Sequence, residues 1–231
     1  MFTVSEDSVR VGGTTRTTRR YPPSMSTSGH PVFAWVYARL GPRADAHGTA
    51  ERRDQLLSNA VGSVVEVGAG TGLNLRHYPP AVTGVVATEP DPHMFRRLAT
   101  ALDTASVPVQ LRRAPADALP VEDGAADTVV MSLVLCSVTN VPDALAEARR
   151  VLRPGGSLLF FEHVRSEDRR MARWQDRLER PWGAIGGGCH PNRDTLAAIR
   201  DAGFEIRDVE RFDERNALLA RPHILGWAVR P

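Results

Sequence analysis

Three glycines at alternate positions constrain this chain more than any other feature of its sequence. Gly68, Gly70 and Gly72 follow directly on the stretch 64–67, whose three valines are typical of a buried strand end. Glycine has no Cβ, so these positions permit a tight turn and a backbone within contact distance of a ligand. A helical pattern begins at Leu73, and the free N–H groups of a helix start would face that ligand. Strand, glycine turn and helix together predict a nucleotide-type cofactor site.

Strand and helix patterns alternate along most of the chain. Strands are expected at 64–67, 82–88, 109–112, 126–133 and 157–161, and helices at 51–60, 92–102, 140–152 and 195–201. Such alternation predicts an α/β fold in which a parallel sheet carries helices on both faces. Asn192 is expected to cap the last helix. Two final strands, 204–211 and 223–229, are expected to form an antiparallel pair.

The length and the local composition suggest how the chain is divided. Its 231 residues suffice for one domain with a large core and a tail. Residues 1–29 are rich in Ser, Thr, Gly and Arg, and we expect a disordered tail there. The domain then covers 30–231 and begins with helices over 30–60, of which the aromatic stretch 30–40 either packs on the domain or forms a lid. Residues 165–191 interrupt the alternation, and we interpret them as an insertion over the carboxyl ends of the strands.

The charged residues and cysteines exclude several functions. All 29 basic residues are Arg, which excludes any mechanism that needs a lysine, such as a Schiff base. The net charge is only +2 and no basic patch with interleaved aromatics is present, so no nucleic-acid partner is expected. No apolar run approaches the roughly 18 residues of a membrane-spanning helix, and no secretory signal is visible. With only two cysteines, we expect a cytoplasmic protein without stable membrane insertion.

Carboxylates help to identify the class of cofactor. Glu66 lies inside the strand two residues before Gly68, where a dinucleotide site more often has an apolar residue. Glu89 follows Gly70 by 19 residues and ends the second strand, where a carboxylate can bind both ribose hydroxyls of either cofactor type. Asp117, in the loop after the third strand, can accept a hydrogen bond from an exocyclic amine.

These motifs together resemble those of the class I S-adenosylmethionine-dependent methyltransferases. The resemblance is strongest over about residues 60–165 and includes 66–72, Glu89, Asp117 and the stretch 150–156 before the fifth strand. It implies a Rossmann-like, seven-stranded, mostly parallel sheet with an antiparallel last strand, and S-adenosyl-L-methionine as the cofactor. Met94 either stacks near the adenine or belongs to the core. The residues implied for cofactor binding are Glu66, Gly68, Ala69, Gly70, Thr71, Gly72, Asn74, Glu89, Pro90, Met94, Ala116, Asp117, Ala118, Ser132 and Leu133.

Further stretches resemble a narrower group, the methyltransferase-like 7 alkyl-thiol S-methyltransferases of animals and their bacterial relatives. These stretches are 74–79, 133–138, 161–164, 188–189 and 221–224. The resemblance implies a small-molecule methyl acceptor, with a thiol as one candidate. The membrane-anchoring apolar helix of those animal proteins has no counterpart in this sequence, which puts membrane attachment in doubt.

The chemistry asks little of a catalyst, because a sulfonium methyl group is already activated. The nucleophile must lie about 3 Å from the methyl group, opposite the leaving sulfur, and a thiol must lose its proton. His163 follows the fifth strand at the ligand edge and is the candidate catalytic base. In the alternative interpretation, Glu162 and His163 form hydrogen bonds to the insertion and hold it down. Tyr37, Cys136 and Trp182 are candidates for the substrate pocket.

No metal site is expected, because Cys189 and His190 have no further ligands clustered near them in the sequence. Two other functions stay open at this point. One is methyl transfer to a quinone, a phospholipid amine, or the nitrogen or oxygen of a natural product. The other is a non-catalytic subunit that binds the cofactor without turnover.

Overall fold

The computed structural model describes residues 49–214 and 218–231. The expected tail, the aromatic stretch 30–40 and the pocket candidate Tyr37 lie outside the described residues. The elements in chain order are α2 (Ala50–Leu57), β1 (Gly62–Val67), β2 (Val82–Thr88), α3 (Pro92–Thr100), η2 (Ala101–Thr104), β3 (Val109–Arg112), β4 (Ala126–Ser132), α4 (Val141–Val151), β5 (Leu152–His163), α5 (Arg169–Ile185), α6 (Thr195–Asp201), β6 (Glu205–Asp213), η3 (Leu218–Ala220) and β7 (Pro222–Val229).

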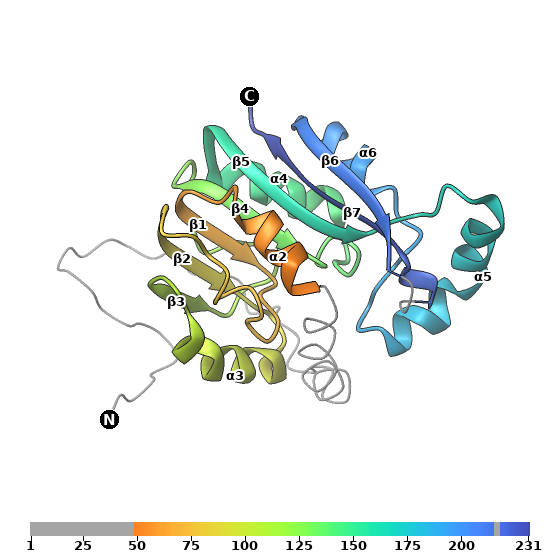
Figure 1. Cartoon of the computed structure of the whole chain (residues 1–231), viewed down its shortest axis with the longest axis horizontal. Helices are drawn as coiled ribbons and strands as arrows, with labels where there is room; N and C mark the ends of the chain where they lie inside the picture. The colour runs from red at the N-terminus through yellow and green to blue at the C-terminus, as the bar shows by residue number, and fades with distance from the viewer. Residues whose placement is uncertain (1–48, 215–217) are drawn as a thin grey trace.

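Within the described residues, seven strands form one sheet in the order β3-β2-β1-β4-β5-β7-β6 (Figure 1). The pairings among β1 to β5 are parallel, whereas β7 runs antiparallel to both of its neighbours, β5 and β6. The expected Rossmann-like, seven-stranded, mostly parallel sheet with an antiparallel last strand is therefore confirmed. The last two strands form the expected antiparallel pair, and β7 lies between β5 and β6.

Helices cover both faces of the sheet because side chains alternate along each buried strand. Val65, Val129 and Leu158 belong to a core cluster that includes the apolar faces of α4 and α6. Their neighbours Val130 and Leu159 belong to a second cluster, with side chains of α2 and α3. Figure 1 shows α2 in front of the sheet and α4 behind it. Strands buried on both sides are expected for the parallel part of such a sheet.

Short polar side chains begin the helices, although one predicted cap is wrong. Asp91 precedes α3 and its carboxylate accepts the N–H of His93 at 2.7 Å. Asn140 caps α4 as expected. The cap of α6 is Asp194, which accepts from Ala197, rather than Asn192. The Asn192 side chain instead donates to the carboxylate of Asp176 on α5, which explains the error, because the cap geometry is available only to the residue next to the helix.

The insertion 165–191 contains the 17-residue helix α5, which the sequence interpretation did not assign. A fully buried side chain, Gln175, holds this helix in place. Its amide nitrogen lies 2.9–3.2 Å from the carbonyl oxygens of Val164, Pro191 and Leu219, and its oxygen accepts the N–H of Ser166 at 2.9 Å. One side chain therefore ties α5 to both ends of the insertion, beyond the carboxyl end of β5 (Figure 1). Among the described helices, none combines the length and apolarity needed to cross a membrane.

Strand β5 begins at Leu152, five residues earlier than expected. The stretch Arg153 to Gly156 was expected to stop the preceding helix and the strand to follow at 157. The Gly155 N–H instead donates to the carbonyl of Arg230 at 2.7 Å, and the Arg230 N–H donates to Gly156 at 2.9 Å. These backbone bonds to the segment after β7 draw the stretch into the sheet.

The packing around β7 predicts that adding one methyl group at Gly226 lowers the stability of the protein. A Cβ at Gly226 would overlap the carbonyl oxygen of Asp208 and lie 2.9 Å from Val209 Cα. We expect Gly226→Ala to destabilise the protein by about 2 kcal/mol or more, the range found for overpacked cores. Gly84→Ala on β2 is the control, because its Cβ would meet its nearest neighbour at an ordinary 3.6 Å. Urea unfolding measures both, and equal stability of Gly226→Ala and the wild type would contradict the described packing of β7.

Candidate functional site

The glycine turn follows the carboxyl end of β1, and its three glycines have different tasks. Gly68, Gly70 and Gly72 all have positive φ, at 62°, 59° and 82°. A Cβ at Gly68 would lie 2.8 Å from a methyl group of Val134, and one at Gly72 would lie 2.8 Å from the Ala101 Cβ. At Gly70 the nearest atom of the described residues to such a Cβ is 4.0 Å away, so those residues leave the space there open. Gly70 therefore presents bare backbone to a ligand, while the other two glycines permit close packing.

The helix expected from Leu73 does not form, which corrects the interpretation of this segment. Residues 73–76 are turns, closed by hydrogen bonds from Leu75 to Gly72 at 3.1 Å and from His77 to Asn74 at 2.9 Å. Two prolines, Pro79 and Pro80, end the segment. Proline disfavours helical backbone in the residue before it, so too few residues stay available to nucleate a helix. A helix N-terminus therefore does not face the cofactor here.

Glu89 joins the end of β2 to the glycine turn. One carboxylate oxygen accepts the N–H of Gly70 and the other accepts the N–H of Asp91, both at 2.9 Å. The Ala69 N–H adds a bond to the Thr88 carbonyl at 2.8 Å. Each carboxylate oxygen keeps a second lone pair, so Glu89 can still accept from two vicinal hydroxyl groups. Burial raises the pKa of Glu89 to about 6, which leaves it ionised at neutral pH.

Glu66 lies at the centre of a buried polar network. Its carboxylate accepts from the side-chain amide of Asn74 and from the hydroxyl of Tyr78, both at 2.9 Å. Arg53 of α2 donates to the Asn74 oxygen at 2.6 Å and reaches the Ser132 hydroxyl at 3.5 Å. Burial raises the pKa of Glu66 to about 7, against the opposing effect of these bonds. The sequence analysis missed Arg53, because one arginine among 29 carries no signal of its own, and it included Tyr78 in the stretch 74–79 without assigning it a role.

Other predicted cofactor residues surround these two carboxylates. Thr71 completes the glycine turn, and Pro90 follows Glu89 at the end of β2. Met94 is buried in the first turn of α3, which fits a place in the core as well as an adenine contact.

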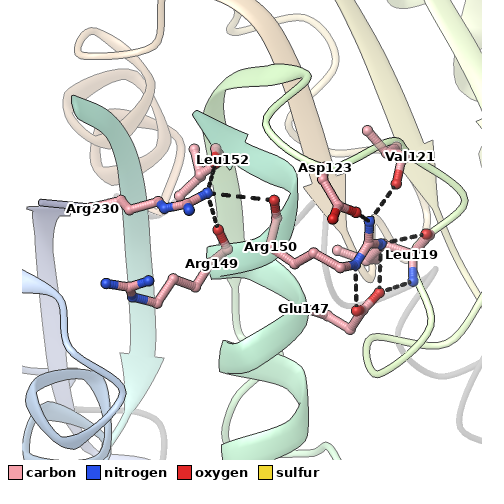
Figure 2. Close-up of polar contacts among 8 residues, drawn as sticks. All are labelled: Leu119, Val121, Asp123, Glu147, Arg149, Arg150, Leu152 and Arg230. Carbon is pink, nitrogen blue, oxygen red and sulfur yellow. Dashed lines mark hydrogen bonds and ion pairs between the residues drawn. The ribbon is translucent and has the colours of Figure 1, made fainter. Parts of the chain in front are cut away.

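The loop with Ala116, Asp117 and Ala118 is held in place by Arg150 of α4. Asp117 is exposed, while the alanines are partly buried. Figure 2 shows the Arg150 guanidinium directed at the end of this loop. Its partners are the carbonyls of Leu119 and Val121, at 3.0 and 2.9 Å, and the carboxylates of Glu147 and Asp123, both at 2.6 Å. Arg150 opens the stretch 150–156 that resembles the family signature, and its position explains why a residue far from the cofactor belongs to that signature.

The loop after β4 rests on a buried carboxylate. Leu133 leaves the strand with a φ of 60°, and the carboxylate of Glu162, which is fully buried, lies beneath the following residues. It accepts the N–H groups of Val134, Leu135 and Cys136 at 2.9, 2.8 and 3.1 Å. Burial raises the pKa of Glu162 well above its ordinary value, while the three N–H donors act in the opposite direction. Glu162 thus fixes the loop after β4, and the alternative in which it binds the insertion is wrong.

His163 lies between the two cysteines. Its Nδ1 is 3.4 Å from the sulfur of Cys136 and 3.4 Å from that of Cys189. Burial lowers the pKa of His163, but the neighbouring Cys136 and Glu162 raise it to a net value above the ordinary one. A hydrogen bond between the thiols, together with burial, raises the pKa of Cys136 to about 12, and the same bond lowers the pKa of Cys189. His163 therefore contacts the insertion, as the alternative interpretation expected, through Cys189.

This grouping was missed because its members are 26 and 27 residues from His163 in the sequence. Sequence neighbours drew attention to His190, whose ring instead pairs with the Glu179 carboxylate at 2.8 Å. The sequence did offer one signal: Cys136 and His163 lie at the carboxyl ends of two predicted parallel strands. The pocket candidate Trp182 is half-buried on α5.

Comparisons with known proteins agree with this geometry. A family model for a methyltransferase domain matches residues 65–160. The human thiol S-methyltransferase TMT1B is 36% identical over 211 residues, which cover 86% of this chain and 86% of that protein. The chain belongs to the methyltransferase family of TMT1B. Human thiol S-methyltransferase TMT1A is 36% identical over 174 residues, covering 73% of this chain and 70% of that protein. A methyltransferase structure from Bacillus halodurans C-125 has a TM-score of 0.66 at 18% identity, covering 78% of this chain and 98% of that one.

Membership of this family makes the protein an S-adenosyl-L-methionine-dependent methyltransferase. The residues present fit that cofactor. The open space at Gly70 admits a ligand against the backbone, and Glu89 has two free acceptor positions for ribose hydroxyls. Glu66, at the end of β1, offers a carboxylate that Asn74 and Tyr78 orient.

We predict that removing the side chain of Glu89 weakens cofactor binding more than removing that of Asp117. We expect Glu89→Ala to weaken binding of S-adenosylhomocysteine about 100-fold, since hydrogen bonds to a charged group contribute about 1.5–3 kcal/mol. Asp117→Ala removes one exposed acceptor and should weaken binding about 3- to 10-fold. Glu205→Ala, on the distant edge strand β6, is the control. Calorimetric titration gives the three affinities, and unchanged affinity of both site variants would show that the cofactor site is misplaced.

Ionisation of Glu89 predicts a pH dependence of cofactor binding. Its pKa of about 6 means that the carboxylate gains a proton, and loses an acceptor position, as the pH falls through that value. Affinity for S-adenosylhomocysteine should therefore fall as the pH is lowered through about 6, and Glu89→Gln should remove this part of the dependence. Glu66→Gln, measured in parallel, separates the contribution of Glu66, whose pKa is about 7. Identical profiles for the wild type and Glu89→Gln would contradict the assignment.

Proposed function

We propose that this methyltransferase transfers a methyl group to the sulfur of a small thiol. The observation that carries the proposal is a convergence of four distant stretches around His163. These stretches are 133–138, 161–164, 188–189 and 221–224. Leu133 donates to the Phe161 carbonyl at 2.7 Å, and Val164 donates to Pro222 at 3.0 Å. Cys189 reaches His163 at 3.4 Å, and His163 pairs with His223 across β5 and β7.

These four stretches carry the narrower resemblance seen in the sequence, and together they form the part of the site that the cofactor motifs do not explain. The family model ends at residue 160, whereas the identity with TMT1B extends over 86% of both chains. The similarity therefore includes the acceptor side of the molecule. TMT1A and TMT1B are thiol S-methyltransferases by name, which supports a thiol acceptor for this chain.

The chain itself has to position two reactants and keep the acceptor deprotonated. When bound, S-adenosyl-L-methionine supplies an activated sulfonium methyl group. The glycine turn, Glu89 and Glu66 would hold this cofactor at the ends of β1 and β2. The acceptor sulfur attacks as a thiolate. The role of His163 as a base stays a prediction. Both cysteine sulfurs contact its Nδ1, so a proton taken from the acceptor would have to bind Nε2.

Methyl transfer from labelled S-adenosyl-L-methionine to a panel of small molecules tests the proposal. We expect methyl thioethers from alkyl thiols, with one S-adenosylhomocysteine formed per product, and no product from matched alcohols. Glu89→Ala should reduce kcat/KM about 100-fold at limiting cofactor, in line with its loss of binding. Glu205→Ala should leave the rate unchanged. Transfer only to amines, phenols or quinones would overturn the thiol assignment and leave the methyltransferase assignment intact.

A cytoplasmic location without stable membrane insertion is a further part of the proposal. Fractionation of cells that express the full chain tests it. Recovery in the soluble fraction at low and high salt would support the proposal, and recovery only with detergent would overturn it.

A further inference from the structure

Cys136, His163 and Cys189 form a compact group of metal-ligand atoms. They come from the loop after β4, the last residue of β5 and the segment after α5. The two sulfurs and an imidazole nitrogen all lie within 4.8 Å of one another. Cys136 is 1% exposed and Cys189 is 5% exposed, so bulk water hardly reaches the sulfur atoms. Two soft sulfurs and an imidazole are a ligand set typical of zinc.

The distances match those of a tetrahedral site. Zn–S bonds of about 2.3 Å and Zn–N bonds of about 2.0–2.1 Å place sulfur and nitrogen ligands about 3.5 Å apart at tetrahedral angles. Both sulfur atoms lie 3.4 Å from Nδ1 of His163. An ion at the centre of this group would therefore require little movement of the ligands.

Both sulfurs have weak hydrogen-bond partners, since the thiols share one hydrogen bond and the Cys136 sulfur lies 3.5 Å from the Ser137 hydroxyl, but these bonds do not explain the place of the imidazole. The Nδ1 atom of a neutral imidazole has either one N–H or one lone pair, so it can form a good hydrogen bond with only one of two thiols. Both sulfurs are nevertheless at the same distance from it. A disulfide between the two cysteines would not explain why the imidazole contacts both sulfurs. A shared cation would bind all three atoms at once.

The ligands are held by other parts of the chain. Cys136 is fixed through its N–H to Glu162, and its carbonyl accepts the N–H of His190 at 2.7 Å, which joins the two cysteine segments. Arg193 donates to the neighbouring Leu135 carbonyl at 2.5 Å. One Zn²⁺ ion balances two thiolates, and the guanidinium of Arg193 is available to balance the Glu162 carboxylate. Outer-shell groups of this kind fix the orientation of metal ligands.

We propose that Cys136, His163 and Cys189 bind one Zn²⁺ ion, and that its fourth position takes the acceptor thiol. The second half of this statement rests on the proposed function. The group lies two strands from the glycine turn along the same sheet edge, about 10 Å at the usual strand spacing. The acceptor would bind there as a thiolate, with its proton released to bulk solvent as it enters the site. Its sulfur then forms the new carbon–sulfur bond while the bond from the methyl carbon to the sulfonium sulfur breaks.

Metal content of the full chain, purified under reducing conditions without chelator, tests the binding site. We expect about one zinc per chain by elemental analysis, as three protein ligands suffice for a zinc site. Cys189→Ser and His163→Asn should lose most of the zinc. His190→Gln is the matched control, because it lies beside Cys189 but pairs with Glu179. Circular dichroism and S-adenosylhomocysteine binding show whether each variant is folded.

Replacement of zinc by Co²⁺ gives a readout that does not depend on activity. Tetrahedral cobalt with sulfur ligands should show sulfur-to-cobalt charge-transfer bands, and an added alkyl thiol should change the visible spectrum. Wild-type protein that binds no zinc or cobalt in its reduced form, or that contains a Cys136–Cys189 disulfide by intact mass, would overturn the site. An unchanged cobalt spectrum at saturating thiol would overturn the thiol as fourth ligand.

Failure of this inference is distinguishable from failure of the proposed function. Fully metal-free protein that methylates thiols at the wild-type rate would overturn the role of the ion and leave the function intact. Zinc-loaded protein that methylates only amines, phenols or quinones would overturn the thiol function and leave the metal site intact.

Discussion

The carboxylate of Glu162 connects the two halves of the site. A buried carboxylate without partners would cost several kcal/mol, and three consecutive N–H groups of the loop after β4 offset that cost. That loop begins at Leu133, on the side of the cofactor, and reaches Cys136, on the side of the acceptor. Glu162 is also followed directly by His163. A single buried carboxyl group beneath the loop therefore fixes the backbone between Leu133 and the sulfur-rich group.

The cofactor side depends on residues that support the ligand-facing carboxylates and loops from behind. Asn74 and Tyr78 orient Glu66, and Arg150 holds the loop of Asp117 from a helix on the other face of the sheet. Two of the three glycines permit close packing against neighbouring side chains, and Gly70 is the one of the three that the described residues leave uncovered. The residues that face the ligand are thus positioned by side chains that do not face it.

Sequence patterns predicted the elements well where the local signal and the tertiary structure agree. The strands 82–88 and 109–112 were predicted to the residue, since β-branched runs bounded by loops have few other stable places. The helix after Gly72 was wrong because the stretch before Pro79 is too short to nucleate one. The complete cysteine–histidine group could not be predicted, because Cys189 meets Cys136 and His163 only when the segment after α5 returns to the loop after β4. Gln175, which fixes that return, looks like any polar helix residue in the sequence.

The position of β7 also determines when the protein can fold during synthesis. Strand β7 is the last strand of the sheet to be synthesised. It nevertheless lies inside the sheet, between β5 and β6. Until it emerges, β5 has an unpaired edge that other chains could add to, and such edges favour aggregation. The cofactor half, by contrast, involves strands made early and can order first. Among the described strands, the acceptor half is therefore completed after the cofactor half, and the β5 edge stays open to other chains until β7 pairs with it.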